Sequence, residues 1–214
     1  YYKELKSISS NLIDMCDFVT DLLGVFIETL ANPDEGNLSR VREKDKKVNE
    51  IDKQVEKLST NIIALRHPLA VDLRYVIAAT KISTMIERQG DMIESAIKKV
   101  ASINSEVAKR YRSELTEISK IDIEMVKHAV HGFSNQDTQN ANKVWRLEDK
   151  IDDLSDENFE KIKQDIKSDT DNTDDYVSLM LIIRGLERVG DYCTKITKAA
   201  HWVTSGKRVS EADF

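Results

Sequence analysis

The chain has 214 residues, of which 40% are hydrophobic and 33% are charged, with only seven glycines and two prolines. A composition so rich in charged and aliphatic residues and so poor in helix breakers is typical of an all-α protein. The formal net charge of −6 argues against nucleic acid as a partner, because binding to phosphates requires clustered lysines and arginines.

Six long helices are predicted from hydrophobic residues at helical spacing, separated by turn signals. The stretch NPDEGN ends the first helix, and RHP separates the second from the third, because Pro68 suits the first turn of a helix. The loop ASINS separates the two halves of the chain. The expected helices cover about 3–31, 38–66, 69–100, 106–133, 138–167 and 175–204.

An internal duplication is indicated by two nearly identical pentads, ERQGD at 87–91 and ERVGD at 187–191. Each pentad falls in the third predicted helix of its half, so the halves can be laid on each other in register. We therefore expect two tandem three-helix bundles built from six long antiparallel helices, with domains at 1–105 and 106–214.

Each pentad places two carboxylates four residues apart, on one face of its helix. The second helix of each half carries a comparable pair, and in the first half Asp52 lies one turn further on. If these two helices are antiparallel neighbours, their oxygen-bearing side chains converge across a groove. The candidate metal ligands are Asp45, Asn49, Glu87, Asp91, Glu148, Asp152, Glu187 and Asp191.

Converging carboxylates suit a hard cation such as Mg²⁺, Mn²⁺, Ca²⁺ or ferric iron. The glycine of each pentad costs a helix roughly 1 kcal/mol, and we expect it to let a neighbouring helix or a metal cluster approach closely. The alternative is that these acids form ordinary solvated faces, with Arg88 and Arg188 pairing with their neighbours. The chain has no Glu-x-x-His motif of the di-iron bundles.

Catalytic residues are not indicated, because the sequence has no nucleophile elbow, phosphate loop or zinc signature. No phosphate pocket is apparent either. The motifs by themselves therefore assign no catalytic chemistry to this protein. Its two isolated cysteines, Cys16 and Cys193, favour a reducing, cytoplasmic setting, and no apolar run reaches the roughly 20 residues that span a bilayer.

The stretch RHPLAVDLRYVIAATKISTMIERQGD resembles the PhoU family, whose first repeat carries R-x-P-x-A-x-D-L-R followed by (E/D)-x-x-x-D. The stretch IIRGLERVGD is similar to the corresponding motif of the second repeat. The family's second-helix pattern, D-x-x-V-(N/D), is similar to Asp45, Val48 and Asn49. A variant of this pattern occurs at Glu148, Ile151 and Asp152.

This resemblance implies acidic motifs that bind multinuclear iron, with zinc, manganese, magnesium, calcium or no metal as alternatives. It also implies a non-catalytic adaptor between the ATPase of a phosphate ABC transporter and a sensor histidine kinase. Such an adaptor represses the phosphate-starvation response when phosphate is plentiful. The family implies a homodimer at the inner face of the membrane, held there by its partners.

Two departures from the family pattern affect the first half. Gln89 stands where the family has an aliphatic residue, and we expect it to loosen the packing or expose the first site. Asn49 is a weaker ligand than a carboxylate, so we expect the first site to be the weaker one. Two other functions stay open, namely an all-helical Mg²⁺-dependent nucleotide pyrophosphohydrolase and a metal-free helical scaffold.

Overall fold

The computed structural model describes residues 1–33, 35–137 and 141–209, and these residues form long helices with no strand among them. The all-α prediction with six long helices is confirmed. The predicted start of the fifth helix at residue 138 lies outside the described residues. The elements are α1 (Tyr2–Ala31), α2 (Glu35–Arg66), α3 (Ala70–Ser102), α4 (Ser105–Ser134), α5 (Ala141–Ser168), the short 3₁₀ helix η1 (Thr170–Asn172) and α6 (Thr173–Ser205).

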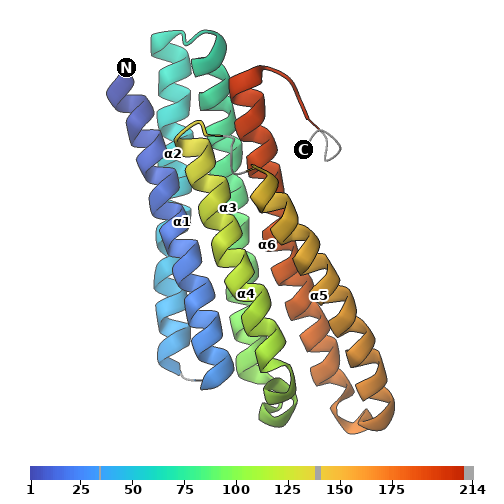
Figure 1. The fold of residues 1–214 in the computed structure, drawn as a ribbon. Coiled ribbons are helices and arrows are strands. Elements are labelled where there is room, and N and C mark those ends of the chain that lie inside the picture. The colour runs from blue at the N-terminus through green and yellow to red at the C-terminus, as the bar shows by residue number, and fades with distance from the viewer. Residues whose placement is uncertain (34, 138–140, 210–214) are drawn as a thin grey trace.

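Successive helices run in opposite directions, and the two repeats lie side by side (Figure 1). Within the repeats, α2 packs on α1 and α3, and α5 packs on α4 and α6. Between the repeats, α1 packs on α4 and α3 packs on α6. The four inner helices therefore join the two three-helix repeats through one hydrophobic core, and α2 and α5 flank this core.

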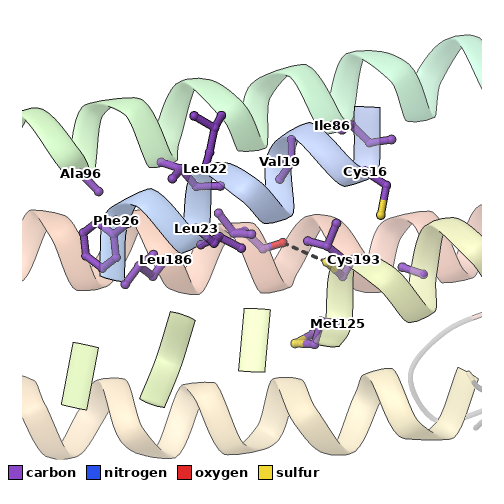
Figure 2. Close-up of a cluster of buried hydrophobic side chains, with 14 of the residues drawn as sticks. Cys16, Val19, Leu22, Leu23, Phe26, Ile86, Ala96, Met125, Leu186 and Cys193 are labelled. Atoms are coloured by element: carbon purple, nitrogen blue, oxygen red, sulfur yellow. Dashed lines mark hydrogen bonds between the residues drawn. The ribbon is translucent and has the colours of Figure 1, made fainter. Parts of the chain in front are cut away.

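The burial pattern of each helix matches its place in this arrangement. The outer helix α2 buries Val41, Val48, Val55 and Ile62, at most 1% exposed, and this spacing of seven residues defines one narrow stripe. The inner helix α1 buries a wider surface, which reaches from Ile8 to Leu30. Its central part, from Cys16 to Phe26, meets residues of α3, α4 and α6 (Figure 2). Each fully buried large apolar side chain contributes about 1.5–3 kcal/mol, so most of this stability depends on contacts between helices.

The turn between α2 and α3 is held by side chains of the R-x-P-x-A-x-D-L-R motif. The Tyr1 hydroxyl donates to the Asp72 carboxylate at 2.6 Å, and Arg74 Nε donates to the Val203 carbonyl at 3.0 Å. The second bond gives a partner to a carbonyl in the last turn of α6, where helical partners are missing. Asp72 and Arg74 therefore link the start of α3 to Tyr1 and to the last turn of α6.

Gln89 lies inside the shared core and not at the surface of the first site, so it does not itself expose that site. Its side chain is 0% exposed and crosses from α3 to α6, where Nε2 donates to the Val189 carbonyl at 2.9 Å and lies 3.3 Å from Cys193 Sγ. The amide forms a hydrogen bond between the two repeats, which an aliphatic residue cannot form.

Asp122 is a second polar residue buried inside the shared core. It lies on α4, is 0% exposed, and neither carboxyl oxygen has a hydrogen-bond partner among the described residues. Burial raises the pKa of Asp122 well above its ordinary range, because a charge without a partner is unfavourable in an apolar interior. The pKa of the nearby Cys193 thiol is also raised, mainly by burial and then by Asp122.

The glycines of the two pentads face neighbouring helices. A Cβ at Gly90 would meet only Leu22 and Val48 side chains, at 3.9 Å, whereas one at Gly190 would lie 3.3 Å from Ile151 Cδ1. Close helix packing is thus the local reason for glycine at position 190, and it applies much less at position 90.

We expect Gly90→Ala to stabilise the protein by about 0.5–1 kcal/mol, because alanine removes the backbone entropy cost of glycine. In a chain of this size that gain raises Tm by roughly 1–4 °C. Gly190→Ala is the matched control, and we expect a smaller gain because Ile151 must shift. Thermal melting of both variants checks the difference, and equal gains would show that Ile151 moves aside at no cost.

Candidate metal centre

The acidic side chains of the first repeat converge where α2 packs on α3. Ligand atoms of Asp45, Asp91 and Glu94 all lie within 4.8 Å of one another. This is the one group of three or more His, Cys, Asp or Glu side chains at such spacing in the described parts of the chain. Asp45 and Glu94 are half-buried and Asp91 is exposed, so the group is open to solvent on one side.

The electrostatics of this group favour a bound cation. Burial and the carboxylates of Glu94 and Asp91 raise the pKa of Asp45. The pKa of Glu87 is also raised, by burial and then by the carboxylates of Asp91, Asp52 and Asp45. Glu87 therefore lies close enough to interact electrostatically with this acidic group. Like charges held this close repel one another, and a divalent or trivalent cation would relieve the repulsion.

Two polar neighbours complete the surroundings of the first site. The Asn49 amide donates to Asp45 Oδ2 at 3.1 Å, and the Lys98 ammonium pairs with Glu94 at 2.9 Å. Asn49 therefore orients Asp45 through its amide nitrogen. Lys98 supplies one positive charge, which a metal ion would have to displace or tolerate.

The corresponding acids of the second repeat lie where α5 packs on α6. Burial, Glu187 and Asp191 raise the pKa of Asp152, so these three predicted ligands do lie near one another. Arg184 forms an ion pair with Glu187, which partly neutralises the group. Glu148 is half-buried on α5, one turn before Asp152.

Glu94 is the one member of the first group that the sequence reasoning missed. It lies three residues after Asp91, and so on the same helix face. The predicted acidic pairs have a spacing of four residues and occur in both halves of the chain. Glu94 has no counterpart in the second half, because Thr194 occupies the equivalent position. The closest convergence therefore lies in the first repeat, although Asn49 led us to expect the weaker site there.

The donor set decides which ligand these residues fit. Asp45, Asp91 and Glu94 supply only carboxylate oxygens, the donors preferred by hard cations such as Mg²⁺, Mn²⁺, Ca²⁺ and ferric iron. Both cysteines are buried and free, and neither belongs to this group. The residues present fit a hard cation better than a thiophilic one.

The fold belongs to a class of duplicated helical bundles. Its two three-helix repeats share one core, and in each repeat acidic side chains of the second and third helix face each other. The family model described as PhoU domain matches residues 12–100 and 115–200, so the chain belongs to the PhoU family. The resemblance inferred from the motifs is thereby confirmed.

Relatives of nearly the same length carry a consistent description. The phosphate-specific transport system accessory protein PhoU homolog of Zymomonas mobilis is 27% identical over 209 residues, which cover 98% of this chain and 88% of that protein. Its Escherichia coli counterpart, phosphate-specific transport system accessory protein PhoU, is 25% identical over 204 residues, covering 95% and 85%.

A solved structure has the same fold. The crystal structure of PhoU from Pseudomonas aeruginosa superposes with a TM-score of 0.87 at 22% identity, covering 97% of this chain and all of that chain. At this level of identity the likeness establishes the fold, and the site must be judged from the residues of this chain.

Proposed function

We propose that this protein is an accessory regulator of phosphate uptake. It would act as an adaptor between the ATPase of a phosphate ABC transporter and a sensor histidine kinase, repressing the starvation response when phosphate is plentiful. The observation that carries the proposal is the match of both repeats to the PhoU domain, together with relatives named as accessory proteins of phosphate-specific transport. An adaptor needs no catalysis, since differential affinity for two partner states shifts signalling.

Membrane association in this proposal is peripheral and depends on the partners. Within residues 1–33, 35–137 and 141–209, no helix combines the length and apolar character needed to cross a bilayer. We propose a homodimer that works at the cytoplasmic face of the membrane and binds the transporter and kinase through its exposed surfaces.

The carboxylates of the first repeat have a supporting part in the proposal. A hard cation held by Asp45, Asp91 and Glu94 would neutralise their repulsion and fix α2 against α3. Iron is the first candidate from the family resemblance. Metal would thus set the shape of the adaptor surface.

We expect tagged protein captured from cell membranes to bring down a phosphate-transporter ATPase and a histidine kinase, in proportions that change between phosphate-replete and phosphate-starved cells. Mass spectrometry of the captured material makes the measurement. The most exposed apolar side chains are the first candidates for a partner contact, and Leu65 and Leu69, beside the α2–α3 turn, are 70% and 79% exposed, more than Val177 and Leu181 on α6 at 45% and 56%. Leu65→Ser with Leu69→Ser should reduce recovery of a partner severalfold.

The matched control changes two other exposed apolar residues, Val177→Ser and Leu181→Ser on α6. It should leave recovery unchanged. Loss of recovery in the control alone would place the contact on α6. If neither partner appears in either growth condition, the adaptor proposal is wrong.

A further inference from the structure

Helices α3 and α6 pack side by side (Figure 1). A cleft of about 390 Å³ is lined by residues 78 and 81 of α3, residues 198, 199 and 202 of α6, and residues 208 and 209 that follow α6. Its walls carry three cationic side chains, Lys81, Lys198 and Arg208, and no carboxylate among the described residues. The volume falls within the roughly 300–1,000 Å³ of small-molecule sites. None of its lining residues is a candidate metal ligand of either repeat.

The positive charge in this cleft is unusual for an acidic chain. Many other lysines lie in ion pairs, such as Lys150 with Glu117 and Lys161 with Glu114. Over the described ranges of the chain, neither Lys81 nor Arg208 takes part in an ion pair. An anion entering the cleft would therefore meet the positive charges of Lys81 and Arg208, neither of which is paired with a carboxylate of the described residues, and a partly enclosed surface strengthens that attraction.

The remaining wall of the cleft is apolar and includes an aromatic ring. Ala78 and Ala199 are too small to fill the space, and the half-buried Trp202 borders it. The Lys198 ammonium lies 4.6 Å from the centroid of the Trp145 ring, so this cation is positioned by α5. An indole face beside cations suits a ligand with a flat ring and an anionic group, because nucleic-acid bases stack favourably on aromatic side chains.

We propose that this cleft is a binding site for a small phosphorylated molecule with an aromatic base, of the nucleoside mono- or diphosphate class. Lys81 and Arg208 contact the phosphate, Lys198 adds positive charge, and Trp202 stacks on the base. No bond is formed or broken. The proposal is independent of the adaptor function and of any metal at the acidic groups.

The test is isothermal titration calorimetry of the full chain with AMP, ADP and inorganic phosphate, with sedimentation of anionic phospholipid vesicles in parallel. We expect one ADP per chain, bound more weakly as salt increases, and bound at least tenfold more weakly by Lys81→Gln with Arg208→Gln. The matched control is Arg112→Gln with Lys120→Gln, which removes the same charge from another open cleft, on α4. The control should bind ADP as the unchanged protein does.

Trp202→Leu separates recognition of the base from recognition of the phosphate. It should weaken ADP binding several-fold and leave any inorganic phosphate binding unchanged. Phosphate bound as tightly as ADP would overturn the role of the base. Vesicle binding that Lys81→Gln with Arg208→Gln abolishes, without nucleotide binding, would assign the cleft to lipid headgroups and overturn the proposal. So would the absence of ADP binding at millimolar concentration, or equal loss in the control.

Discussion

Asp122→Asn is expected to stabilise the protein at pH 7 by roughly 1–4 kcal/mol, because proton uptake on folding costs up to about 1.4 kcal/mol for each pH unit above the unfolded-state pKa of the aspartate. The aspartate is ionised in the unfolded chain at this pH and must take up a proton to enter the core, because burial raises its folded-state pKa. Asparagine is nearly the same size and needs no proton. The change should therefore remove the cost of proton uptake without leaving a cavity.

The dependence on pH identifies the cause. A group whose folded-state pKa is raised is most favourable below its unfolded pKa, about 3.9 for aspartate. Its contribution is lost as pH rises toward the folded pKa. The advantage of Asp122→Asn should therefore be smallest near pH 4 and grow by up to about 1.4 kcal/mol per pH unit above it.

Urea unfolding of both proteins between pH 4 and pH 8 measures this difference. Other groups titrate alike in the two proteins and cancel. The neighbouring thiols stay neutral over this range, since burial raises the pKa of Cys16 to about 12 and that of Cys193 well above its ordinary value. A difference that is constant with pH would show that Asp122 does not take up a proton on folding.

The combined change Asp45→Asn, Asp91→Asn and Glu94→Gln is expected to abolish tight binding of a hard cation by the first repeat. In the unchanged protein, a metal at 100 times its Kd should add about 2.7 kcal/mol of stability, or roughly 5–11 °C in Tm for a chain of this size. A chelator should remove this gain. The triple variant should lose the metal-dependent change that belongs to the first repeat, while its metal-free form stays folded because mutual repulsion is lost.

Elemental analysis after dialysis against iron, manganese, zinc or magnesium, combined with thermal melting, makes the measurement. A control with Glu56→Gln, Glu157→Gln and Glu160→Gln removes the same charge from exposed positions and should bind metal normally. Asp152→Asn, Glu187→Gln and Asp191→Asn test the second repeat separately. If all these proteins bind no metal and retain regulation, the metal-free scaffold is correct. Pyrophosphate release from nucleoside triphosphates by the unchanged protein, but not by the variants at the acidic groups, would favour the enzyme alternative.

The candidate metal centre shows how far spacing along one helix can predict a site. Glu87 with Asp91 and Glu187 with Asp191 could be paired from the sequence, because residues four apart share a helix face. That Asp45 reaches Asp91 and Glu94 depends on how α2 is rotated and shifted against α3, which the helical period does not specify. Glu94 had no counterpart in the second repeat, so the duplication could not identify it.

Six helices, an internal duplication and the PhoU family could be predicted from the sequence. Each of these features depends on residues that are close together in the chain or repeated at a fixed offset. Only the tertiary structure shows that the repeats share one core, that Gln89 joins α3 to α6, and that Asp122 is buried with no hydrogen-bond partner among the described residues. It also brings Lys81 together with Lys198 and Arg208, which both lie more than 100 residues after Lys81 in the sequence. These features depend on which helix faces pack together, and that choice is made by the burial of apolar surface over the whole chain.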